Sequence, residues 1–280
     1  MAAARKTLSP AARRVVRFID RNRIAVLASS ATELGASIGT SDATVVRAVQ
    51  ALGFEGLDDL RQTLLTSLDR RSTPADDMRR TLADVGENAD RAIEVVLETH
   101  REAIEAMQSG RTRSYIAAAV AALHRGERIW VFGIGPSAAL ARYAVTMLRR
   151  SGRQADVLDA TGLGLADQLL GLREGDALLV FAYSNPYREV MATFREGHRL
   201  GLPVVLITDC VDSRLARFAE VVIPVRRGRT ERVALHGATL VGLEALILGL
   251  AVSDQRGAIT ALERLNDLRE AVFGKRADAG

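Results

Sequence analysis

Five short apolar runs, separated by segments with helical periodicity, constrain the fold of this 280-residue chain more than any other feature. Each run is apolar at nearly every position, whereas a strand with one solvent-exposed face would alternate apolar and polar residues. Fully apolar runs that alternate with helices predict a parallel sheet covered by helices on both faces. The runs span residues 129–132, 155–158, 177–183, 204–208 and 221–225.

The first part of the chain lacks such runs and is predicted to be all-helical. Ser9 and Pro10 combine a capping hydroxyl with a proline at the first helical position, which marks the start of a helix. We expect a second helix from Thr32 to Gly39, a third capped by Ser41, and a fourth over residues 58–68. The polar stretch 70–77, which contains a proline, indicates a linker.

Later segments with helical spacing complete the predicted architecture. They comprise a connecting helix that ends near residue 109, a helix over residues 112–124, and two closing helices over 237–252 and 256–272. We therefore predict three parts. An all-α domain covers residues 1–72, a linker and connecting helix cover 73–110, and an α/β domain covers 111–280.

Residues 31–52 combine a short helix, a glycine turn and a second helix whose first turn is small and polar. This pattern is typical of a helix that enters the major groove of DNA, although an ordinary helical hairpin shares it. Hydroxyl groups contact phosphates or bases, and an arginine can grip guanine with two hydrogen bonds. The candidate DNA-binding residues are Ser41, Asp42, Ala43, Thr44 and Arg47.

The distribution of charge supports the same interpretation. Residues 1–75 carry eleven basic and seven acidic residues, and this excess equals the net charge of +4 of the whole chain. The rest of the chain is therefore balanced. Its single cysteine, Cys210, excludes a disulfide framework, and no apolar stretch is long enough to span a membrane. We expect a cytoplasmic protein without a cofactor.

The run Ser41-Asp42-Ala43-Thr44-Val45-Val46-Arg47, followed by Leu52-Gly53-Phe54-Glu55-Gly56, closely resembles the N-terminal domain of the RpiR (MurR/RpiR) family of bacterial regulators. The resemblance covers roughly residues 8–68. It implies a sequence-specific DNA-binding transcriptional regulator that is not an enzyme. It also implies that the second domain is an SIS (sugar isomerase) domain that senses a sugar phosphate or a related carbohydrate metabolite.

The segment after the first apolar run allows three interpretations. Gly133, Gly135 and Ser137 are suited to bind a phosphate, because glycines permit close backbone approach and a helix start supplies amide donors. The glycines also suit tight strand-to-helix packing alone. With Ala138 they match a dinucleotide-binding fingerprint, for which Asp159 would be the ribose-binding acid.

The loop after the third run departs from the family pattern. Phosphosugar-binding SIS domains usually have Ser-x-Ser-Gly-x-Thr-x-Glu there, and this chain keeps only Ser184 and Glu189 of that pattern. Two hydroxyl donors are missing, and Arg188 is a candidate replacement. The expected effector-binding residues are Gly133, Gly135, Ser137, Ser184, Asn185, Arg188, Glu189 and Thr208.

The partners expected are an operator in double-stranded DNA, a small-molecule effector, and further copies of the chain in a homodimer or homotetramer. Helices 237–252 and 256–272 are candidate interface elements. A sugar-phosphate isomerase is the alternative function, with Glu189, His236 and Glu244 as candidate acid–base groups. A second alternative is a repressor that senses nicotinamide dinucleotides. The basic loop with Arg226, Arg227, Arg229 and Arg232 is expected to be solvated.

Overall fold

The computed structural model describes residues 9–69, 73–183, 187–209 and 211–273. It divides into two compact units, Met1–Asp76 and Asp77–Gly280.

The N-terminal unit is all-helical. Its core is formed by aliphatic side chains from every helix, among them the fully buried Val15, Val26, Val45 and Val49. The α2 helix is only six residues long and was not expected from the sequence. The elements are α1 (Pro10–Arg21), α2 (Arg23–Ala28), α3 (Ala31–Ile38), α4 (Asp42–Ala51) and α5 (Leu57–Asp69).

The second unit contains a five-stranded, all-parallel sheet with strand order β2-β1-β3-β4-β5. The predicted parallel sheet is therefore confirmed. Two of the strands end earlier than expected, since β3 stops at Phe181 rather than Tyr183 and β5 at Pro224 rather than Val225. The strands are β1 (Arg128–Phe132), β2 (Gln154–Leu158), β3 (Ala177–Phe181), β4 (Val204–Thr208) and β5 (Val221–Pro224).

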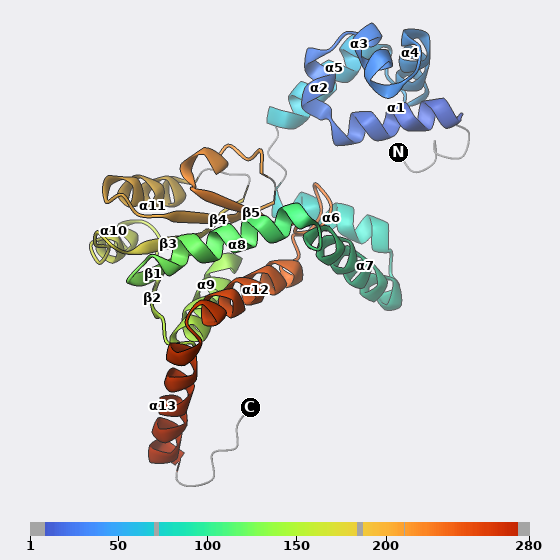
Figure 1. Cartoon of the computed structure of the whole chain (residues 1–280). Helices are drawn as coiled ribbons and strands as arrows, with labels where there is room; N and C mark the ends of the chain where they lie inside the picture. Colours follow the sequence, from blue (N-terminus) through green and yellow to red (C-terminus); the bar gives the residue numbers. More distant parts are fainter. Residues whose placement is uncertain (1–8, 70–72, 184–186, 210, 274–280) are drawn as a thin grey trace. The chain divides into compact units, whose positions relative to one another are not determined.

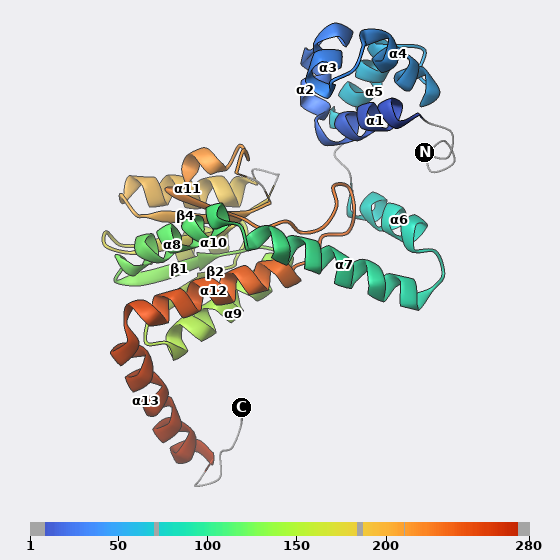
Figure 2. The ribbon, with the colours of Figure 1, turned by 45° about the vertical axis from the view of Figure 1, so that its right-hand side comes forward.

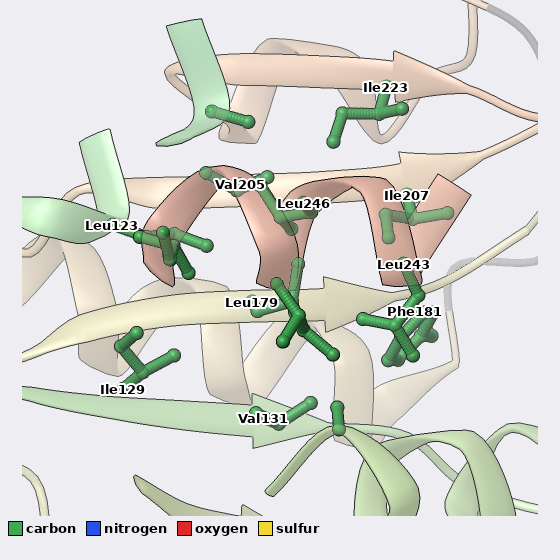
Figure 3. Close-up of a cluster of buried hydrophobic side chains, with 14 of the residues drawn as sticks. Leu123, Ile129, Val131, Leu179, Phe181, Val205, Ile207, Ile223, Leu243 and Leu246 are labelled. Atoms are coloured by element: carbon green, nitrogen blue, oxygen red, sulfur yellow. The ribbon is translucent and has the colours of Figure 1, made fainter. Parts of the chain in front are cut away.

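Alternate side chains of β1, β3 and β4 enter two separate cores, as the two-residue period of a strand requires. In β3, Leu179 and Phe181 face a large core shared with α8 (Gly110–His124), α9 (Pro136–Arg150) and α12 (Gly237–Ser253), part of which is drawn in Figure 3. Leu178 and Val180 face the opposite core under α10 (Leu163–Leu169) and α11 (Arg188–Arg199). Helices thus cover both faces of the sheet.

Two further helices, α6 (Pro74–Val85) and α7 (Ala89–Met107), precede α8 and run in opposite directions, joined by a short turn (Figure 2). The stretch 70–77, which was predicted to be a linker, contains the boundary between the two units but is helical from Pro74 onward. Pro74 is the first residue of α6, and the Thr73 hydroxyl accepts a hydrogen bond from the Asp76 N–H at 3.2 Å as a helix cap does. The proline therefore begins a helix.

The last helix, α13 (Gln255–Phe273), follows α12 after a bend of 105° and leads away from the sheet layers (Figure 1). It buries only Ala258, so most of its apolar side chains are exposed. Within the described residues, no single helix is both long enough and apolar enough to cross a bilayer. The pair α12 and α13 meets that criterion only when the two bent helices are taken together.

Candidate functional site

The turn between α3 and α4 has the geometry that a helix-turn-helix motif needs. Gly39 ends α3 with φ of +70°, a left-handed conformation that favours glycine. Gly35 lies so close to the turn that a Cβ at this position would be 2.8 Å from the Thr40 carbonyl oxygen. The two glycines therefore allow α3 and α4 to pack tightly against each other.

The first turn of α4 is fixed by hydrogen bonds among the predicted DNA-binding residues. The Ser41 hydroxyl caps the helix by accepting the Thr44 N–H at 3.3 Å, and the two hydroxyls are 2.9 Å apart. Asp42 accepts the Ala43 N–H at 2.6 Å, so its carboxylate stabilises the positive end of the helix dipole. These polar groups hold the helix start rigid while remaining at the surface.

One face of α4 is buried and the other is exposed. Val45, Ala48 and Val49 face the core, whereas Asp42, Ala43, Arg47, Gln50 and Ala51 are exposed. Gln50 was missed in the sequence analysis although it lies one turn beyond Arg47. It is the side chain type that binds adenine with two hydrogen bonds. Helical spacing from Ala43 and Arg47 was the signal that identifies it.

In the α/β unit, the loop after β1 requires glycine. A Cβ on Gly133 would be 2.4 Å from the Ser137 carbonyl oxygen, and Gly135 precedes α9 with φ of +57°. Ser137 is buried in the first turn of α9. Its N–H donates to the Ile134 carbonyl at 3.2 Å, so this loop also closes on itself. The side chain of Ser137, rather than its amide, is the group suited to contact a ligand.

The other predicted effector residues follow neighbouring strands at the same edge of the sheet. Thr208 is fully buried at the end of β4. Arg188 is exposed and Glu189 is half-buried in the first turn of α11, which follows β3. Ser184 and Asn185 lie outside the described residues. Since β1, β3 and β4 are adjacent and parallel, their carboxyl ends meet at one edge, where open α/β sheets bind ligands.

A set of polar side chains also gathers at this edge, which we call the Arg227 cluster: Tyr183, Asp209, Arg227, His236 and Thr239. The sequence named His236 and Arg227 separately, but it did not indicate that the five side chains lie together. The Arg227 guanidinium carbon lies 3.4 Å from the centroid of the Tyr183 ring, and the Tyr183 hydroxyl is 3.4 Å from that of Thr239. Asp209 is 3.8 Å from Arg227, beyond hydrogen-bond distance. The expectation of a solvated loop is therefore wrong at Arg227, whose side chain is only 22% exposed.

Burial determines the titration behaviour of the Arg227 cluster. It raises the pKa of the Tyr183 phenol and lowers the pKa of the Arg227 guanidinium. Burial and the nearby charge of Arg227 both lower the pKa of His236 below its ordinary value of 6.5. His236 is therefore neutral at pH 7, with one ring nitrogen available as an acceptor.

Both halves of the chain match known protein families. The model of the rpiR-family helix-turn-helix domain matches residues 1–71, and the SIS domain model matches residues 122–252. Together these matches cover most of the sequence, in the order in which the two units occur. The chain belongs to the RpiR family.

Relatives of this RpiR-family protein have the same organisation. An uncharacterized HTH-type transcriptional regulator of Caldanaerobacter subterraneus subsp. tengcongensis is 21% identical over 266 residues, which are 94% of this chain and 93% of the relative. The NanR protein of Vibrio vulnificus, solved in complex with ManNAc-6P, is 22% identical with a TM-score of 0.56. That match covers 98% of this chain and 99% of NanR. The fold is thus shared along the whole chain.

The sugar isomerase domain of an RpiR transcription factor from Sphaerobacter thermophilus has a similar fold to the second unit. It is 24% identical with a TM-score of 0.55, and the match covers 63% of this chain and 98% of that domain. The α/β unit of this RpiR-family protein is therefore an SIS domain in its fold.

Proposed function

We propose that this RpiR-family protein is a sequence-specific DNA-binding transcriptional regulator whose SIS domain senses a sugar phosphate or a related carbohydrate metabolite. The observation that carries this proposal is the exposed, rigidly capped start of α4 within a chain that also contains an SIS domain. We assign DNA binding to residues 1–72 and effector binding to residues 111–280. Residues 73–110 connect the two activities.

The exposed face of α4 carries three kinds of DNA contact. Arg47 is suited to guanine, Ser41 and Thr44 to phosphate or base, and the small Ala43 to a thymine methyl group. The Arg47 Nε donates to the Ala43 carbonyl at 3.1 Å, and the terminal nitrogens of this exposed side chain are available for a bidentate contact. Asp42 contributes by capping rather than by contacting phosphate, because like charges repel.

Selection of sequences from a random duplex library by the purified full chain tests DNA binding. We expect enrichment of a two-fold symmetric site, and about 5- to 150-fold weaker binding of that site by Arg47→Ala, the range that one bidentate base contact provides. Arg195→Ala, at an exposed position on α11, is the matched control and should bind like the wild type. Unenriched sequences, or equal loss in both variants, would exclude the assignment of α4.

The effector pocket is proposed at the carboxyl edge of the sheet. Its residues are Gly133, Gly135, Ser137, Ser184, Asn185, Arg188, Glu189 and Thr208. Support comes from the closeness of the β1, β3 and β4 ends and from the requirement for glycine at position 133. The NanR structure contains a phosphosugar, which supports a ligand of the same class.

The loop after β5 offers a route from this pocket toward the DNA-binding unit. We call its contacts with α6 the loop–helix clamp. In the clamp, the Arg80 Nε donates to the Glu231 carbonyl at 3.1 Å, and the Val233 N–H donates to the Thr81 hydroxyl at 3.0 Å. Arg232 pairs with Asp84 at 2.7 Å. Because α6 follows the DNA-binding residues directly in sequence, a shift of this loop would move α6. The position at which the DNA-binding unit is attached would then change.

Backbone strain in the clamp supports a switching role. Glu231 has φ of +58° and is the one non-glycine residue with a positive φ in the described part of the chain. Such a conformation is unfavourable for a residue with a side chain and persists where surrounding contacts impose it. We therefore propose that the loop has a second, relaxed arrangement that the effector favours or disfavours.

The two alternative functions have weaker support. As an isomerase, the protein would need an acid and a base across one sugar bond, but Glu244 already accepts the Tyr143 hydroxyl at 2.9 Å on exposed helix surfaces. As a nicotinamide sensor it would need Asp159 to bind ribose, yet Asp159 is paired with Arg142 at 2.6 Å and with Gln168 at 3.1 Å. Turnover of a phosphosugar would support the isomerase function, and thermal stabilisation by NADH alone would support the nicotinamide sensor.

We further propose a homodimer or homotetramer that works in the cytoplasm, where the chromosome is. Apolar side chains on α12 and α13, including Leu248, Val252, Ile259 and Phe273, are exposed and support an interface there. Light scattering of wild type and Leu248→Glu checks the assembly. A smaller particle is expected for the variant, and an unchanged mass would exclude α12 from the interface.

A further inference from the structure

The Arg227 cluster contains two buried polar atoms that lack partners within the described part of the chain. The Nε of Arg227 and the Nδ1 of His236 are both buried, and no described residue hydrogen-bonds to either of them. Buried polar groups in folded proteins are almost always hydrogen-bonded, and an unpaired one is unfavourable for stability. Both atoms belong to side chains that contact Tyr183, which indicates a polar site that a bound ligand can complete.

The cluster lies at the same sheet edge as the proposed effector pocket. Tyr183 follows β3, Asp209 follows β4 and Arg227 follows β5, and these three strands are neighbours. Tyr183 packs against the core on the side of α9 and α12, and α9 begins with the loop of Ser137. The cluster therefore extends the pocket across the edge from β1 to β5.

The geometry of Arg227 suits an oxyanion. Stacking on Tyr183 holds the guanidinium plane in one orientation, and a guanidinium held in this way presents a fork that matches a carboxylate or phosphate. Arg227 also supplies N–H donors in place of the two hydroxyl donors that the loop after β3 lacks. With Asp209 nearby and His236 neutral, the cluster has no net charge, which favours one added monoanion over a dianion.

The loop that carries the cluster is built to hold it in place. The Leu235 N–H donates to the Arg227 carbonyl at 2.8 Å and closes the loop on itself. His236 precedes α12, and the His100 ring of α7 lies 2.7 Å from the position that a Cβ on Gly237 would occupy. Arg227 and His236 are therefore held at the base of the loop, on either side of the clamp residues Glu231–Val233.

We propose that the Arg227 cluster is the oxyanion subsite of the effector pocket, in which Arg227 binds the carboxylate or phosphate group of a carbohydrate metabolite. The terminal nitrogens and Nε of Arg227 donate to the oxyanion, and His236 contacts a neighbouring hydroxyl of the sugar through its free ring nitrogen. This inference rests on the proposed function, because it names the chemical class that the sensor recognises.

Ligand binding to the full chain tests the proposal, with acetate, inorganic phosphate, D-glucuronate, D-glucose 6-phosphate and uncharged D-glucose as probes. Thermal shift and calorimetry are expected to detect at least one anion and no binding of glucose. A larger response to glucuronate than to glucose 6-phosphate identifies a carboxylate as the natural group, and the reverse identifies a phosphate. A wild-type protein that binds none of the four anions overturns the proposal.

Substitution of Arg227 gives the decisive comparison. Arg227→Gln is expected to weaken anion binding by about 10- to 100-fold, the value of a lost charge-assisted contact. Arg229→Gln, at an exposed position on the same loop, is expected to bind like the wild type. Equal affinities for Arg227→Gln and wild type overturn the proposal.

The stability of the ligand-free variants separates binding from a structural role. Since the Nε of Arg227 is buried without a partner among the described residues, Arg227→Gln and Arg227→Met should unfold no earlier than the wild type without ligand. A lower melting temperature of both would identify Arg227 as a structural cation and overturn the proposal. DNA binding by the same preparations keeps the two hypotheses apart. A wild type that binds no DNA contradicts the proposed function, whereas an anion bound equally by Arg227→Gln contradicts only the subsite.

Discussion

The loop–helix clamp leads to the most detailed prediction, which concerns Thr81. The Thr81 hydroxyl accepts the Val233 N–H at 3.0 Å and donates to the Asp77 carbonyl at 2.8 Å within α6. Thr81→Val keeps the shape of the side chain but removes the acceptor, so the Val233 N–H loses its partner. The loss of such a bond in a partly buried position weakens the clamp by about 1–2 kcal/mol.

That energy is comparable with the coupling that a regulator needs. The coupling free energy between two sites is typically about 1–3 kcal/mol. A loss of about 1 kcal/mol therefore reduces the effector-induced change in affinity roughly five-fold. In Thr81→Val we therefore expect the effector-induced change in DNA affinity to shrink by about that factor. The affinity for the effector in the absence of DNA should change much less, because the Arg227 cluster is intact.

Fluorescence anisotropy of labelled operator DNA, with and without saturating effector, measures this change. Thr146→Val is the matched control because the Thr146 hydroxyl makes a similar bond to the Arg142 carbonyl at 3.0 Å, on an exposed part of α9. It should preserve the response. An undiminished response in Thr81→Val, or an equal decrease in both variants, would refute the clamp as the route of coupling.

Three other predictions concern single sites. Ser41→Ala removes the cap of α4, so thermal unfolding should show a loss of about 1 kcal/mol from the N-terminal unit together with weaker DNA binding, and an unchanged melting curve would contradict the capping role. Gly133→Ala places a Cβ 2.4 Å from the Ser137 carbonyl oxygen, so the loop must shift and calorimetry should find weaker effector binding; wild-type affinity would show that the loop is not part of the pocket. The lowered pKa of His236 means that the unfolded chain binds more protons than the folded one below about pH 6.5, so the free energy of unfolding falls as pH falls through that range. In chemical denaturation at several pH values, His236→Gln should reduce this pH dependence, and an equal dependence in both proteins would contradict the burial of a neutral imidazole.

The sheet was predictable from the sequence because its physical requirement is local. A strand buried on both faces needs apolar residues at nearly every position, and Leu178 through Phe181 satisfy this directly. The order of the strands was not predictable in this way, since pairing depends on long-range contacts. The capped start of α4 was predictable as well, because Ser41 acts within a single turn.

The elements missed by the sequence analysis depend on context. The polar composition of residues 74–77 suggested a linker, but their proline begins α6, whose Arg80 and Thr81 contact a loop about 150 residues later in the chain. Arg227 was expected to be solvated for the same reason. Its burial follows from Tyr183 and Asp209, which are distant in sequence and are brought beside it by adjacent strands. No pattern within residues 226–232 encodes that position.

The central claim is that one chain couples a carbohydrate metabolite to DNA. Measuring the dissociation constant of the selected operator with and without the effector, and that of the effector with and without operator, tests it directly. We predict at least a five-fold change in each, and the same factor in both, because linkage between two ligands is reciprocal. Dissociation constants that the second ligand leaves unchanged would contradict the account.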